Sequence, residues 1–151
     1  MRIYLVIVDE SAEALVALQF AARRAAKTGG VLHLLALVPP QPFNAFAGVQ
    51  ATIEEEARAR AETLVTAAAG NLLSQGGKMP VISVHMGEDV KVVRKYLAEH
   101  PEVSALVLGA AAEGGPGALV THFTGAGMAH VPCPVYVIPG GLDAETIERL
   151  S

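Results

Sequence analysis

Five short apolar runs divide the chain, and segments with helical periodicity lie between them. The runs are Ile3–Val8, Val31–Val38, Pro80–Met86, Ala105–Leu108 and Pro134–Ile138. The first two are apolar on both faces, which is typical of strands buried on both sides of a parallel sheet. Strands that alternate with helices predict one α/β domain over residues 1–151, with helices on both faces of a parallel sheet and right-handed crossovers.

The segment after the first run has the signals of a helix start and stop. Ser11 is a good N-cap, and Glu13 lies in the first turn, where a carboxylate is favourable. Gly29-Gly30 ends the segment. The residues predicted to face the core are Leu15, Leu18, Ala22 and Ala25.

The longest helix is predicted over residues 52–75. Thr52 and Glu55 form a capping-box pattern at its start. The apolar stripe consists of Ile53, Ala57, Ala61, Leu64, Ala68 and Leu72. Residues 41–50 before it are predicted to be irregular. Phe43 and Phe46 in that loop are expected to be anchored on the core, with a partner surface as the alternative.

Two further helices and a tail complete the pattern. The first places Val90, Val93 and Leu97 inward. The second runs from about Ala118 to His130. Residues 140–151 form a tail, in which Asp143 caps a short helix.

Composition excludes several classes of protein. Of 151 residues, 52% are hydrophobic and 17% charged, which supports a large core and argues against disorder. The net charge of −4 lacks the positive excess that is typical of nucleic-acid-binding domains. No apolar run reaches the length of a membrane span, and the start of the chain lacks the features of a signal peptide. The single cysteine, Cys133, cannot form an internal disulfide and suits the cytoplasm.

The glycine-bearing loop after the fourth run is the best candidate for a site. Ligands in open α/β sheets bind at the carboxyl ends of the strands. However, no Lys or Arg occurs between Lys95 and Arg149. A P-loop requires a lysine here, and a dinucleotide fingerprint requires glycines after the first strand, so neither is present. A phospho-acceptor receiver domain is set aside, because the ends of its third and fifth strands would need Asp and Lys.

The five histidines form no metal-ligand pattern, and no metal site is expected. His33 and His85 lie in strands and are interpreted as structural. His122 with Thr121 and Thr124 could suggest a base and a nucleophile, but no acid is placed to orient the histidine. No catalytic residue is therefore assigned.

The chain resembles the universal stress protein family over nearly its whole length. Three features carry the resemblance: Val8-Asp9-Glu10-Ser11 after the first strand, LHLLALV at 32–38 before a loop and long helix, and a strand ending at Gly109 with Pro132-Cys-Pro-Val135 before the last strand. The resemblance implies a Rossmann-like open sheet of five parallel strands in the order 3-2-1-4-5. It also implies that many members are homodimers, and that many bind ATP at the carboxyl ends of strands 1 and 4.

Carrying the family's ATP pattern across assigns a set of ligand-binding residues for the case that a nucleotide binds. They are Asp9, Val38, Gly109, Ala112, Thr121, His122, Phe123 and Thr124. The pattern is degenerate: Gly109 matches its first glycine, whereas Ala112 and Thr121 replace the other two. The spacing between these two is also one residue short. Glu10 beside Asp9 would repel phosphate unless the carboxylates held Mg²⁺.

These observations predict a cytoplasmic, non-enzymatic regulatory or interaction protein with weak or no ATP binding. The alternative is a stress sensor that binds ATP or AMP with Mg²⁺, with slow ATP hydrolysis left open. A third reading is an enzyme acting on an unknown small molecule in the same crevice.

The last strand predicts the partner. Val135, Tyr136, Val137 and Ile138 form an apolar edge strand, and an uncovered edge invites pairing with a second copy. A homodimer through this strand is expected, without nucleic acid or membrane partners.

Overall fold

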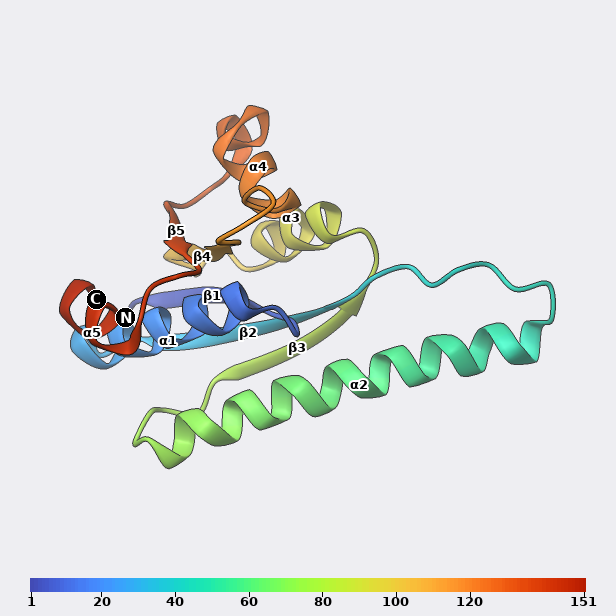
Figure 1. The fold of residues 1–151 in the computed structure, drawn as a ribbon, viewed down its shortest axis with the longest axis horizontal. Helices are drawn as coiled ribbons and strands as arrows, with labels where there is room; N and C mark the ends of the chain where they lie inside the picture. The colour runs from blue at the N-terminus through green and yellow to red at the C-terminus, as the bar shows by residue number, and fades with distance from the viewer.

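The computed structural model describes all residues 1–151 and contains one parallel sheet with helices on both sides (Figure 1). The strands are β1 (Ile3–Val8), β2 (Val31–Val38), β3 (Val81–Met86), β4 (Ala105–Ala110) and β5 (Val135–Pro139). They are ordered β3-β2-β1-β4-β5, and every neighbouring pair is parallel. This confirms the predicted fold class and strand order.

The helices divide between the two faces of the sheet. They are α1 (Ala12–Thr28), α2 (Ala47–Ser74), α3 (Asp89–Glu99), α4 (Ala118–Thr124), a 3-10 turn η1 (Ala126–His130) and α5 (Ala144–Leu150). Val6 points to the core beneath α1 and α2, whereas its neighbour Leu5 points to the core beneath α3 and α4. None of the helices combines the length and apolar composition needed to cross a bilayer.

Helix α1 begins and ends as predicted, and three of the four residues predicted to face the core do so. Ala25 is buried, and Leu18 and Ala22 are partly buried against the core. Ser11 Oγ accepts a hydrogen bond from Ala14 N at 3.2 Å, and Gly29 ends the helix at φ 68°. The fully buried positions are Ala14, Ala17, Ala21 and Ala25. Leu15 is 57% exposed, so its predicted burial was wrong. Small side chains on the buried face let the helix lie close to the sheet.

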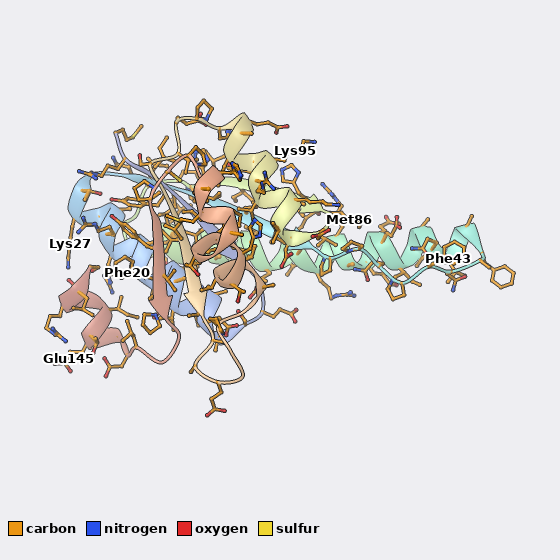
Figure 2. The ribbon with its side chains drawn as sticks, turned by 90° about the horizontal axis from the view of Figure 1, so that it is seen from above. Phe20, Lys27, Phe43, Met86, Lys95 and Glu145 are labelled. Atoms are coloured by element: carbon orange, nitrogen blue, oxygen red, sulfur yellow. The ribbon has the colours of Figure 1, made fainter.

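Helix α2 begins at Ala47, earlier than predicted. Thr52 is inside the helix, where its hydroxyl donates to Gly48 O at 3.0 Å, so the predicted capping box was wrong. The helix extends beyond the sheet, and the loop from β2 runs out to its far end (Figure 1). Phe43 and Phe46 are 90% and 74% exposed, which contradicts their predicted anchoring on the core. Figure 2 labels Phe43 on the loop that runs beside α2, near the outer end of this arm.

The segment predicted as one helix over 118–130 is broken in two. Gly125 adopts φ −105° and ψ −129°, which no helix accommodates, so α4 ends at Thr124 and η1 follows. Within α3, Val93 and Leu97 are buried as predicted.

Candidate functional site

The carboxyl ends of β1 and β4 open into a hollow of about 140 Å³, at the predicted crevice. One wall comes from the turn between β1 and α1, with Asp9, Ser11 and Glu13. The opposite wall comes from residues 116–120, at the end of the glycine loop and the start of α4. Gly109 lies at the bottom. The switch in strand order between β1 and β4 creates this position, as expected for an open α/β sheet.

Asp9 is held by the start of α1. Its Oδ1 accepts hydrogen bonds from the Ser11 backbone N–H at 2.8 Å and from the Ser11 hydroxyl. The same hydroxyl oxygen accepts from Ala14 N and so caps the helix. No protein donor bonds the second carboxylate oxygen, Oδ2, which leaves it free to accept from a ligand hydroxyl.

The hollow is acidic. Asp9, Glu13 and Asp89 all line it, and no lysine or arginine does. Asp89 Oδ1 accepts from Val90 N at 2.8 Å, so one of its oxygens is used at the start of α3. Three carboxylates without a cation oppose a polyphosphate and favour either a cation or an uncharged ligand.

Gly109 has a structural reason to be glycine. A Cβ at this position would lie 2.1 Å from the backbone oxygen of Glu13, because α1 crosses β4 at very short range. The glycine that matches the family's nucleotide motif is therefore required by packing alone, and its presence is not evidence for a ligand.

A second hollow, of about 290 Å³, lies on the other side of Asp9. Val38, at the end of β2, and Leu64, on α2, contribute to its apolar part. Arg60 lines it and is its only lysine or arginine. Arg60 lies three residues after Ala57 and four before Leu64, a spacing that puts all three on one side of α2.

The remaining predicted ligand residues line neither hollow. They are Ala112, Thr121, His122, Phe123 and Thr124. Phe123 is 1% exposed in the core. The hydroxyls of Thr121 and Thr124 donate to carbonyls of their own helix, at 2.9 and 2.6 Å. The start of α4 faces the hollow, whereas its last turn does not.

His122 packs against its neighbours, whereas Ala112 is exposed. The His122 ring packs edge-on against Phe123, with centroids 4.9 Å apart, and a Cβ on Gly127 would overlap it. Ala112 is exposed near the start of the glycine loop. That loop is a surface turn, in which Gly114, Gly115 and Gly117 have positive φ and would meet no neighbour if they carried a Cβ.

Cys133 is half-buried and outside both hollows. Burial raises the pKa of its thiol above the ordinary value. A raised pKa disfavours the reactive thiolate form of Cys133.

Comparison with known proteins identifies the family and the fold. A profile of the universal stress protein family matches residues 1–139. The chain belongs to this family. No curated protein sequence matches it significantly.

Solved structures of universal stress proteins share the architecture. UspA from Lactobacillus plantarum is 22% identical with a TM-score of 0.74, over 91% of this chain and 97% of that one. A universal stress protein from Arabidopsis thaliana with AMP bound is 15% identical with a TM-score of 0.58, over 92% of each chain. A universal stress protein in complex with cAMP is 18% identical with a TM-score of 0.52, over 91% of this chain and 96% of that one.

Proposed function

We propose that this protein is a non-enzymatic, homodimeric regulatory protein of the cytoplasm whose crevice binds ATP weakly or not at all. The observation that supports this most is the acidic hollow, in which Asp9, Glu13 and Asp89 face the glycine loop without a lysine or arginine. A triphosphate placed there would meet like charges. Repulsion between exposed charges a few ångströms apart costs on the order of 1 kcal/mol per pair.

A bound magnesium ion would reduce the repulsion between the three carboxylates and a triphosphate. Carboxylate oxygens are ligands that Mg²⁺ prefers, and the ion usually joins them to substrate phosphates. The affinity for ATP is therefore measured both with and without Mg²⁺, and we expect it to be weak in both conditions.

The second candidate function is a sensor for a nucleoside or nucleoside monophosphate in the second hollow. The observation that favours it is Arg60, which lines that hollow together with Asp9 and Val38. A purine would lie on the apolar wall, Asp9 Oδ2 would accept from a ribose hydroxyl, and Arg60 would pair with a single phosphate. The relatives crystallised with AMP and cAMP make this class of ligand chemically reasonable.

The non-enzymatic part of the proposal is supported by the absence of an assembled acid–base pair. His122 lies outside both hollows, and the threonine hydroxyls bond their own helix. We expect no phosphate release when the protein is incubated with ATP and Mg²⁺; catalytic turnover would contradict this part.

Charge neutralisation tests the reason given for weak ATP binding. Glu13→Gln combined with Asp89→Asn keeps the shapes but removes two negative charges, so the affinity for Mg-free ATP should rise by about 5- to 30-fold. Glu145→Gln, which removes a charge from the distant helix α5, is the matched control and should leave affinity unchanged (Figure 2). Titration calorimetry measures all three proteins. Equal ATP affinities in wild type and double variant would contradict the electrostatic argument.

A further inference from the structure

A cluster of histidine, tyrosine and glutamate side chains lies beneath α3, away from both hollows. His33 comes from β2, Tyr96 from α3, His100 from the residue that ends α3, and Glu102 from the following turn. Candidate ligand atoms of His33, His100 and Glu102, one from each residue, all lie within 4.8 Å of one another. The fold thus brings together residues from two elements that are far apart in the sequence.

Hydrogen bonds orient both imidazole rings. His33 is 6% exposed, and its Nδ1 lies 2.7 Å from the Tyr96 hydroxyl, which leaves Nε2 as its available nitrogen. His100 Nδ1 lies 2.8 Å from Glu102 Oε1, and the His100 ring stacks on Tyr96 with centroids 4.1 Å apart. The Tyr96 hydroxyl lies outside the candidate ligand set and orients His33, as outer partners orient ligand histidines in metal sites. The His100–Glu102 contact instead joins two of the candidate ligands, and a bound ion would take its place.

We propose that His33, His100 and Glu102 form a binding site for a divalent transition-metal ion of the zinc type. Two imidazoles and one carboxylate are a known ligand set for zinc, with water completing the coordination. Zinc–ligand distances near 2.1 Å place tetrahedral ligands about 3.4 Å apart, so the atoms have to approach by about 1.4 Å at most. Glu102 is exposed and is free to make most of this movement.

The end of α3 favours a cation at this place. The last turn of a helix presents unpaired carbonyl oxygens and a partial negative charge. His100 is the C-cap of α3, and the last turn of this helix contains no basic residue that would compete with an ion. The site therefore departs from the sequence-based expectation of no metal, because the pattern of histidines along the chain did not reveal their contact.

Cobalt and zinc titrations test the proposal directly. Co²⁺ should give visible absorption bands of a site with nitrogen and oxygen ligands, and Zn²⁺ should abolish them and raise the melting temperature. His100→Gln and Glu102→Gln should each weaken Zn²⁺ binding by about tenfold or more. Replacing the buried His33 could prevent folding, whereas His100 and Glu102 are at least partly exposed. Thermal melting without metal verifies that both variants fold.

Matched variants distinguish this site from adventitious binding. His130→Gln removes an exposed histidine outside the cluster and should bind Zn²⁺ like wild type. Asp89→Asn tests the acidic hollow, which is the other place where a cation could bind, and should also leave Zn²⁺ affinity unchanged. Equal Zn²⁺ affinity in wild type, His100→Gln and Glu102→Gln, or no binding at millimolar Zn²⁺, would overturn the proposal. No nucleotide is present, so the result does not depend on the function proposed above.

Discussion

Gly109 lies where helix α1 comes closest to strand β4. The residue faces the backbone of Glu13, and no atom larger than hydrogen fits between them. The same helix buries only alanines at its four fully buried positions. Close packing of α1 on the sheet therefore explains both these alanines and Gly109, the one glycine that matches the nucleotide motif.

Gly109→Ala should destabilise the protein without any ligand present. The added methyl group would lie 2.1 Å from Glu13 O, and relief requires α1 or β4 to shift. Overpacking of this kind costs about 1–3 kcal/mol, or roughly 3–10 °C in melting temperature. The control is Gly70→Ala on the exposed side of α2, where no atom lies within 4 Å and the better helix former should stabilise slightly. A thermal melt that ranks Gly109→Ala at or above wild type would contradict the packing argument.

The positions of individual site residues could be predicted only at the ends of strands, where the backbone fixes them. Asp9 and Val38 end strands, so their positions at the crevice follow from the strand pattern. Thr121 and Phe123 were assigned by counting along a motif, and the structure turns both away from the hollows. Whether a residue in a helix faces a crevice depends on where the helix begins, and the break at Gly125 and the short α4 are not visible in the periodicity.

Among the elements, α5 shows how a predicted cap controls a short helix. Asp143 Oδ1 accepts from Thr146 N at 2.8 Å, as predicted for an N-cap. This bond to the backbone N–H holds the pKa of the Asp143 carboxyl below its ordinary value of 3.8. Helix α5 lies against α1, and Glu148 forms ion pairs with Arg23 and Lys27.

The lowered pKa of Asp143 predicts an acid-dependent contribution to stability. Because the folded-state value lies below the unfolded-state value, the contribution is complete above pH 3.8 and is lost as the pH falls through the folded-state pKa. Asp143→Asn keeps a capping oxygen but does not titrate, so its melting temperature should fall less steeply with acid than that of wild type. Melting curves between pH 2 and pH 6 measure this. Parallel curves for the two proteins would show that Asp143 makes no such contribution.

The start of the long helix α2 was not predicted correctly from the sequence. Sequence reasoning placed its start at Thr52 because a capping-box pattern occurs there, but the helix already begins at Ala47. The apolar stripe was predicted well where α2 covers the sheet, at Ala57, Ala68 and Leu72. The first turns lie beyond the sheet and bury little, so no hydrophobic period marks them.

At the scale of the whole molecule, β5 is the exposed edge of the sheet next to the crevice. Only β4 pairs with it, along one side. Tyr136 packs inward against Phe20, with centroids 6.0 Å apart, whereas Val137 is 36% exposed. A second copy of the chain is the natural partner for such an edge.

Val137→Lys should shift the proposed dimer toward monomer. A lysine on the exposed side of β5 places like charges near one another across the interface while leaving the core unchanged. Lysine at Tyr136 would instead damage packing, so it is a poor test. Light scattering over a range of concentrations measures the mass. A monomeric wild type at high concentration, or an unchanged dimer in Val137→Lys, would contradict pairing through this edge.

The architecture was predictable as a whole because five apolar runs and the intervening helices allow few topologies. The two hollows and the His33 cluster were not, because they depend on which side chains meet across the sheet. His33 and His100 come together only after β2 and α3 have packed.

We propose that the crevice of this universal stress protein family member is too acidic for a triphosphate. Calorimetric titration of the wild-type protein with ATP and then with AMP, each with and without Mg²⁺, tests it most directly. We expect ATP to bind no more tightly than in the millimolar range, and AMP to bind more tightly than ATP if any nucleotide does. Micromolar ATP affinity, in either condition, would contradict it.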